Sequence, residues 1–329
     1  MSYIPVIDLT ACKTGNAKSL TEIGRIVDGA CVEHGFLILT GHGIERSLID
    51  ALICVSKDFF SHSDAYKNRH SRPSPDHGKG YCGVKKEALS YSLGHETPPD
   101  IKESFSIGQV IIKNNSYYKN DTALKHFTEN IWPDIEGFRD IYTEYYLAME
   151  KLSAQVMSLF AIALELDHDY FIPLINRSIS NLRVLHYPVI RDPFEQGQLR
   201  AGAHTDYGSL TILAVAEGPF APYGLQVLHQ NGVWSDVPMI PDSFIVNIGD
   251  LMMMWTNNRW KSTLHRVINP NLSALTNIER MSIAFFHQPN YDVLIEPLPG
   301  CIASNSKVHY PPVTSGQHLR EKFLKTREI

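Results

Sequence analysis

A change of hydrophobic period near residue 180 limits the folds open to this chain. Between residues 138 and 163 the apolar residues recur every three or four positions, which predicts a long amphipathic helix. Beyond residue 180 the apolar residues alternate in short runs separated by Gly, Pro and Asn. These runs lie at residues 181–187, 209–216, 225–228, 244–248 and 280–286. Strands that follow helices, without helices between them, predict a mainly β sandwich or barrel with a helical buttress and disfavour a Rossmann fold.

The amino-terminal half adds fewer strands. Residues 4–9 and 36–40 are short apolar runs that predict strands, and residues 45–60 have helical spacing. Residues 71–100 contain four prolines and four glycines, which predicts a long irregular loop able to cover a site. With 329 residues, 43% of them hydrophobic, the chain can bury the core of one large domain or two small ones.

Charge and cysteine content exclude several classes of function. The 35 acidic and 30 basic residues give a formal net charge of −5, which offers no general attraction for nucleic acid or an anionic membrane. Five cysteines without a C-x-x-C pair fit neither a disulfide framework nor a zinc finger. The first residues lack a signal-like stretch, so we expect a cytoplasmic protein with a small-molecule partner. We expect no nucleic-acid, membrane or obligate protein partner.

Two histidines and an aspartate form a candidate metal site. His204 and Asp206 are two residues apart, so at the end of a strand both side chains project from the same face. His265 follows 59 residues later on another predicted strand. Two His and one Asp match a facial triad, which leaves three positions open on an octahedral metal and is typical of non-haem Fe(II) sites. An H-x-D triplet also arises by chance, and a lone histidine is more often an ordinary polar residue.

A second pair of polar residues raises the odds of a functional site. Arg280 and Ser282 lie on one face of a predicted strand that continues into an apolar run. A buried guanidinium needs an anion, and its fork binds a carboxylate in a bidentate way while a hydroxyl adds another donor. The pair therefore predicts a site for the distal carboxylate of a dicarboxylate cosubstrate. A structural salt bridge is the alternative reading.

Together these residues resemble a known pattern: H-x-D, a distant H and then R-x-S occur in Fe(II)/2-oxoglutarate-dependent dioxygenases. The chain is most similar to the isopenicillin N synthase-like group. Residues 4–9 and 34–44 resemble that group's amino-terminal region, and residues 246–250 and 256–267 resemble its core signature. The resemblance implies a double-stranded β-helix, or jelly roll, at the core. It divides the chain into an amino-terminal non-haem dioxygenase region (1–120), a helical buttress (121–177), the dioxygenase core (178–295) and a carboxy-terminal segment (296–329).

The resemblance also implies the cofactors and their ligands. His204, Asp206 and His265 would bind Fe(II) as the catalytic centre, with 2-oxoglutarate and O2 as cosubstrates and ascorbate as a candidate reductant. Arg280 and Ser282 would bind the C5 carboxylate of 2-oxoglutarate. Tyr187 matches a tyrosine that reaches the same carboxylate in many relatives.

The primary substrate is expected to be a small metabolite. The implied reaction is oxidation of an unactivated C–H bond by hydroxylation, or by desaturation or cyclisation, with release of succinate and CO2. Phe286 and Gln288 continue the inward face of the strand and are candidate substrate contacts. Phe105 is a third candidate, because its segment approaches the pocket in relatives.

Two other functions remain open from the sequence. One is an oxidase of the same fold that uses no 2-oxoglutarate, since such enzymes can also carry R-x-S. The other is a catalytically silent sensor of a small acid or a metal. The presence of all three metal ligands argues against the sensor.

Overall fold

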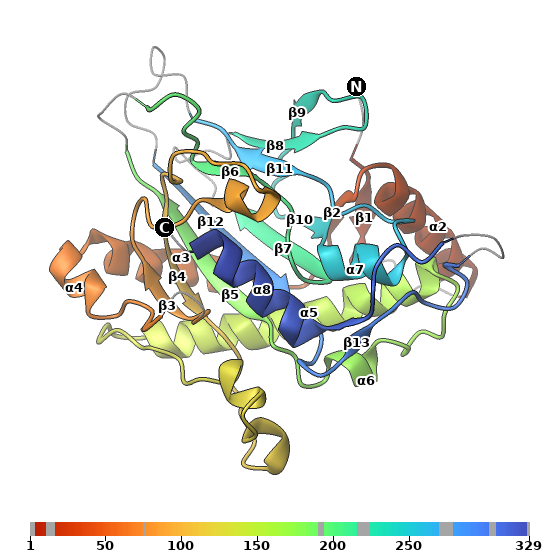
Figure 1. The fold of residues 1–329 in the computed structure, drawn as a ribbon, viewed down its shortest axis with the longest axis horizontal. Coiled ribbons are helices and arrows are strands. Elements are labelled where there is room, and N and C mark those ends of the chain that lie inside the picture. The colour runs from red at the N-terminus through yellow and green to blue at the C-terminus, as the bar shows by residue number, and fades with distance from the viewer. Residues whose placement is uncertain are drawn as a thin grey trace.

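Two facing β-sheets form the centre of the fold, and helices cover the outer face of the larger sheet (Figure 1). The structure is a computed structural model. It describes residues 4–10, 17–74, 77–189, 194–215, 224–269, 279–302 and 307–327.

The larger sheet has eight strands. In spatial order they are β1 (Val6–Asp8), β2 (Phe36–Thr40), β10 (Phe244–Ile248), β7 (Leu210–Val215), β12 (Arg280–His287), β5 (Asn181–Tyr187), β4 (Glu103–Ile107) and β3 (Gly80–Cys82). The pair β1–β2 is parallel, and the other pairs within this sheet are antiparallel. Strands from the amino-terminal half therefore extend the core sheet at both ends.

A smaller antiparallel sheet faces the middle of the larger one. Its strands, in spatial order, are β6 (Ala201–His204), β11 (His265–Val267), β8 (Leu225–Leu228) and β9 (Trp234–Asp236). A separate ribbon pairs β13 (Leu294–Ile295) with β14 (Val313–Thr314). Apolar residues of both main sheets share one buried cluster, so the two sheets pack face to face as in a jelly roll.

Seven α-helices and three short 3₁₀ turns are present among the described residues. They are α2 (Ala17–Glu33), α3 (Arg46–Ser61), α4 (Asp64–Asn68), α5 (Phe138–Ala163), α6 (Ile172–Ile175), α7 (Asp250–Trp255), α8 (Ser315–Arg327), η1 (Leu89–Leu93), η2 (Ser116–Tyr118) and η3 (Ala123–Lys125). The long helix α5 lies against the larger sheet, where Tyr146 meets Phe285 of β12 at a ring-centroid distance of 5.3 Å. None of these helices combines the length and apolar character needed to cross a bilayer.

Strand alternation separates a helix-packed face from a cavity face. On β12, Met281 and Ile283 belong to the core beneath the helices, whereas Ser282 and Ala284 face the smaller sheet. The alternating pattern in the sequence therefore decides which side chains can reach a site between the sheets.

The predicted mainly β fold with a helical buttress is confirmed. The helix expected at 138–163 and the strands expected at 36–40, 181–187, 225–228 and 244–248 have the predicted bounds. The loop expected at 71–100 is interrupted, because it contains β3 and η1.

Candidate metal centre and active-site cavity

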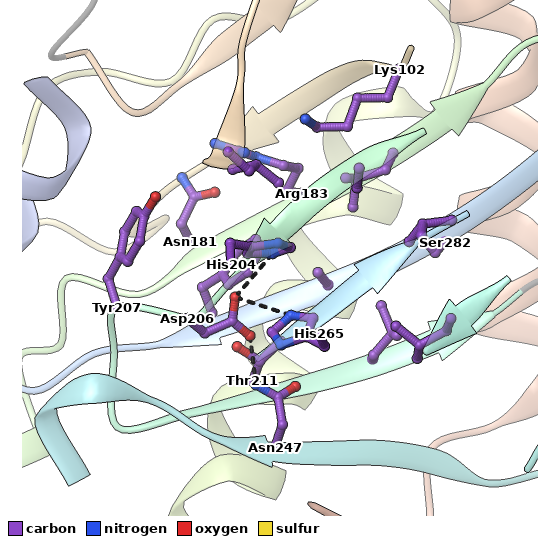
Figure 2. A pocket seen from close by; sticks show the side chains of 18 of the residues that line it. Lys102, Asn181, Arg183, His204, Asp206, Tyr207, Thr211, Asn247, His265 and Ser282 are labelled. Atoms are coloured by element: carbon purple, nitrogen blue, oxygen red, sulfur yellow. Dashed lines mark hydrogen bonds and ion pairs between the residues drawn. The ribbon is translucent and has the colours of Figure 1, made fainter. Parts of the chain in front are cut away.

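A cavity between the two sheets collects the residues expected to carry the chemistry. Its volume is about 1000 Å³ with the open mouth included. Figure 2 shows His204, Asp206 and His265 converging at its centre, with Ser282 on one side and Tyr207 on the other. The polar residues that line it are Lys102, Asn181, Arg183, Tyr187, His204, Asp206, Tyr207, Thr211, Asn247, His265, Arg280, Ser282 and Gln288.

Two adjacent strands bring the candidate metal ligands together. His204 ends β6 and His265 begins β11, and the two residues pair directly in the antiparallel register. Nε2 of each histidine lies 3.8 Å from Oδ1 of Asp206, and the three ligand atoms lie within 4.8 Å of one another. A single ion can therefore contact two nitrogens and one carboxylate oxygen on one face.

Backbone carbonyls fix the orientation of both histidines. Nδ1 of His204 lies 2.7 Å from the carbonyl of Gly202, and Nδ1 of His265 lies 3.1 Å from the carbonyl of Thr263. A carbonyl only accepts, so each Nδ1 donates a hydrogen bond to it, and each ring turns its Nε2 toward Asp206. Burial, with a further contribution from His265, lowers the pKa of His204 to about 3, which leaves its ring neutral at physiological pH.

Asp206 is held as a carboxylate. Asn247 on β10 donates a hydrogen bond of 2.6 Å from Nδ2 to Oδ2 of Asp206, which leaves Oδ1 toward the histidines. Burial alone would raise the pKa of Asp206, but the nearby His265 and His204 and the bond from Asn247 outweigh it and lower the pKa. The site thus presents a charged oxygen ligand at neutral pH.

Arg280, Ser282 and Tyr187 gather at one end of the cavity. Arg280 is 1% exposed, lies opposite Tyr187 in the register of β12 and β5, and places its guanidinium 4.8 Å from the centre of that ring. Its Nη1 lies 3.4 Å from Oγ of Ser282. Among the described residues, Arg280 has no carboxylate partner, and its Nε has no hydrogen bond. This end of the cavity therefore offers a buried cation that lacks an anion.

Two of the three predicted substrate contacts line the cavity, and the third does not. Phe286 on β12 and Gln288, the residue after its end, both line the cavity, as the inward face of this strand predicts. Phe105 does not: it is fully buried in the helix-side core, 4.9 Å from Phe59 between ring centroids. In β4 it pairs with Val184, which also points toward the helices, so alternation directs Phe105 away from the substrate. The structure corrects this expectation.

Several cavity residues escaped the sequence reasoning. Asn247 lies within a recognised signature, but the sequence carries no sign that it bonds Asp206 across the cavity. Lys102, the residue before β4, and Arg183 on β5 both line the cavity. They lie near each other because of the register between β4 and β5. The carboxy-terminal helix α8 adds Leu319 and Phe323 to the lining. A long-range contact of this kind has no local sequence signal.

The loop before β4 supports the strand that carries His204. Asp100 accepts hydrogen bonds from the backbone of Gly202, at 2.8 Å, and of Leu89, at 3.2 Å. A Cβ at Gly202 would collide with Oγ of Ser90, so any larger residue would force the Ser90 side chain to move. Since the Gly202 carbonyl orients His204, this loop positions a metal ligand as well as bordering the cavity.

Comparisons with known proteins agree with this geometry. The 2OG-Fe(II) oxygenase superfamily matches residues 178–289, and the non-haem dioxygenase in morphine synthesis N-terminal family matches residues 4–135. The 2-oxoglutarate-Fe(II) type oxidoreductase hxnY of Emericella nidulans is 32% identical over 97% of this chain and 89% of its own length. A homoarginine-6-hydroxylase of Oryza sativa subsp. japonica is 31% identical over 98% of this chain and 96% of its own.

A solved structure extends the likeness to three dimensions. The crystal structure of a full-length Neurospora crassa protein in complex with alpha-KG (2-oxoglutarate) and thymine has a TM-score of 0.84 and 29% identity, covering 98% of this chain and 96% of that one. Sequence and fold therefore match oxygenases along nearly the whole length. The chain belongs to the 2OG-Fe(II) oxygenase superfamily and is an oxidoreductase that uses Fe(II), 2-oxoglutarate and O2 to oxidise a small molecule.

Proposed function

We propose that His204, Asp206 and His265 bind the Fe(II) of this oxygenase and that Arg280 and Ser282 bind the C5 carboxylate of 2-oxoglutarate. The observation that carries the proposal is their arrangement in one cavity: three convergent ligand atoms lie at its centre and a buried, anion-free guanidinium lies at one end.

The donor set fits ferrous iron. Two imidazole nitrogens and one carboxylate oxygen leave half of an octahedral shell open, as a bidentate keto acid and O2 require. The backbone bonds to both Nδ1 atoms hold the two Nε2 atoms toward the metal position, and the bond from Asn247 keeps Asp206 oriented. Nothing in the surrounding contacts has to be broken for a metal to bind.

The Arg280 end fits a carboxylate. Its guanidinium is desolvated, and Ser282 and the ring of Tyr187 border it. Lys102, another cation of the cavity, is already 2.5 Å from Asp100 and does not compete for the ligand. A carboxylate at Arg280 would receive charge-assisted hydrogen bonds where burial strengthens them.

When bound, Fe(II) and 2-oxoglutarate supply the O2-dependent oxidation of a C–H bond, with succinate and CO2 as coproducts. The chain contributes position and shielding. Arg280 and Ser282 anchor the cosubstrate, and Asn247 keeps the Asp206 carboxylate aligned. Leu319 and Phe323 of α8 cover part of the cavity with apolar surface, which limits the entry of water.

The primary substrate is proposed to bind at the Phe286 and Gln288 end. These residues lie six and eight positions beyond Arg280 along the chain, Phe286 within β12 and Gln288 just past its end, so they leave the anchor end to 2-oxoglutarate. The relatives are named with different small molecules: one is called a homoarginine-6-hydroxylase, and another was crystallised in complex with thymine. Their names therefore do not select a substrate for this chain.

Metal binding tests the ligand assignment without knowledge of the substrate. We expect wild-type protein to bind one Fe(II) in anaerobic equilibrium dialysis, and His204→Ala and Asp206→Ala to lose most of that binding. His168→Ala is the matched control, because His168 lies outside the cavity with its side chain 65% exposed. Undiminished Fe(II) binding by both triad variants, with their circular dichroism unchanged, would refute the assignment.

A further inference from the structure

Five charged side chains form a cluster beside the cavity, with three cations and two carboxylates: the buried Glu87, Asp100, Lys102 and Arg183 and the partly exposed Arg72. Nζ of Lys102 lies 2.5 Å from Oδ2 of Asp100, and Nη1 of Arg72 lies 2.7 Å from Oε1 of Glu87. Each carboxylate thus has one cation at contact distance. Arg183 is the third cation, and its Nη1 lies 3.6 Å from Oε2 of Glu87, beyond a hydrogen bond.

Among the described residues, the ion pairs of Lys102 and Arg183 involve no carboxylate other than Asp100 and Glu87. Burial, followed by the nearby Glu87, raises the pKa of Cys82 to about 11, so its thiol is neutral. Among the described residues that line the cavity, Asp206 is the one carboxylate, and it belongs to the proposed metal site. Fe(II), Asp206, doubly charged 2-oxoglutarate and Arg280 have formal charges that cancel. The surplus positive charge at Arg183 is therefore left for another ligand.

The side chain of Arg183 is held so that the two terminal nitrogens of its guanidinium are available to a ligand in the cavity. Its Nε donates to Oγ of Ser106 at 3.0 Å, which fixes the plane of the group. The two terminal nitrogens form no hydrogen bond with the described residues, and the side chain lines the cavity. The ring of Phe286 lies 5.6 Å from the guanidinium carbon and gives an apolar wall next to the charge. Such an end-on pair of donors matches the two oxygens of a carboxylate.

The position of Arg183 separates it from the proposed 2-oxoglutarate anchor. Arg280 pairs with Tyr187, and Arg183 pairs with Ala284, four residues further along β12. Four residues of strand span about 13 Å, so the two arginines serve different parts of the cavity. In Figure 2, Arg183 lies next to Asn181 and His204, while Ser282 lies across the cavity.

We propose that the primary substrate carries a carboxylate, that the two terminal nitrogens of Arg183 bind it, and that Phe286 packs against the carbon skeleton. This inference rests on the proposed function, because it takes Arg280 to be occupied by 2-oxoglutarate. It names Arg183 as the residue that determines substrate class. A buried cation with an incomplete ion pair gains most from a charged partner, whereas a neutral carbonyl would leave the surplus charge in place.

Paired probes test the substrate class. Benzoate with benzamide and hexanoate with hexanamide differ in charge but hardly in shape. Their affinities are measured by anaerobic isothermal titration calorimetry on Fe(II)-loaded protein saturated with 2-oxoglutarate. We expect wild-type protein to bind at least one acid roughly 10- to 150-fold more tightly than its amide, the range of one charge-assisted contact. Equal affinities, tighter binding of the amides, or no binding of either acid would overturn the proposal.

Matched variants test the residue. Arg183→Gln is expected to reduce the acid-to-amide ratio to near one. Arg46→Gln removes a surface cation that neither lines the cavity nor contacts Glu87, so the ratio should persist. A ratio that survives Arg183→Gln, or that falls equally in Arg46→Gln, would overturn the assignment. If Arg183→Gln does not fold, Arg183→Lys, which keeps the charge and loses the fork, should lower the ratio severalfold, and an unchanged ratio contradicts the proposal.

The two proposals can fail separately. Binding of 2-oxoglutarate to wild-type protein, measured in the same titration before any probe is added, tests the proposed function alone. If 2-oxoglutarate binds but the acids show no preference, the inference about Arg183 fails and the proposed function stands. If 2-oxoglutarate does not bind, the proposed function fails. The inference about Arg183 fails as well if the preference for acids is lost in Arg280→Gln but persists in Arg183→Gln.

Discussion

Replacing Arg280 by glutamine is expected to weaken 2-oxoglutarate binding without weakening the fold. The guanidinium is 1% exposed and has no carboxylate partner among the described residues, so its charge is desolvated without compensation in the absence of a ligand. Removing an uncompensated buried charge relieves a penalty. The ligand-free variant should therefore unfold at the wild-type temperature or above it.

The expected loss of affinity follows from the contacts that a carboxylate would make there. A hydrogen bond to a charged group contributes about 1.5–3 kcal/mol, so losing one such contact raises the Kd for 2-oxoglutarate roughly 10- to 150-fold. Arg280→Lys keeps a point charge but loses the fork, so it should lie between wild type and Arg280→Gln. Ser282 and Tyr187 are untouched in both variants.

The assay is anaerobic isothermal titration calorimetry of 2-oxoglutarate into Fe(II)-loaded protein, with a thermal melt of each variant in the absence of ligand. Arg46→Gln is the control, because Arg46 lies on the surface with its side chain 41% exposed, outside the cavity. An Arg280→Gln protein with wild-type affinity would refute the anchor. A large fall in the melting temperature of the ligand-free variant would instead show that Arg280 has a structural partner and contradict the charge argument.

Two further predictions concern groups that support the site. Asn247→Leu removes the 2.6 Å bond to Asp206 and should weaken Fe(II) binding by about 10- to 100-fold in equilibrium dialysis, and undiminished affinity would show that this bond does not matter. Burial alone would lower the pKa of His186, but hydrogen bonds to Glu103 and Glu279 outweigh it and raise the pKa. The stabilisation from charged His186 is therefore complete below its unfolded pKa of about 6.5 and is lost as the pH rises through the higher folded value. In urea titrations His186→Gln should thus destabilise the protein more in mildly acidic than in alkaline buffer, and an equal loss at both would contradict the assignment.

Local patterns were enough to predict the strands that build the site. The alternation in residues 181–187 and 280–286 places Arg280, Ser282 and Tyr187 on one face because the side-chain period of a strand is two. The same rule explains the wrong expectation for Phe105. Which face of its strand β4 meets the helices depends on the register with β5, which the local sequence does not set.

The other parts of the site could not be predicted, because they depend on contacts between residues far apart in the sequence. Asn247 and Asp206 are 41 residues apart and meet only after β10 and the segment following β6 are packed together. The same holds for Leu319 and Phe323, since the polar sequence of α8 gives no sign that these two side chains line a cavity. Composition reveals the charges of Arg183 and Glu87, but their spacing depends on the fold.

The most direct test of the account is an anaerobic titration of Fe(II)-loaded protein with 2-oxoglutarate, followed by visible absorption. Chelation of ferrous iron by a keto acid gives a weak charge-transfer band that needs no primary substrate. We expect a saturable band in wild-type protein and none in His265→Ala. A protein that binds Fe(II) but shows no band, or a band that survives in His265→Ala, would contradict the assignment of the metal and cosubstrate site.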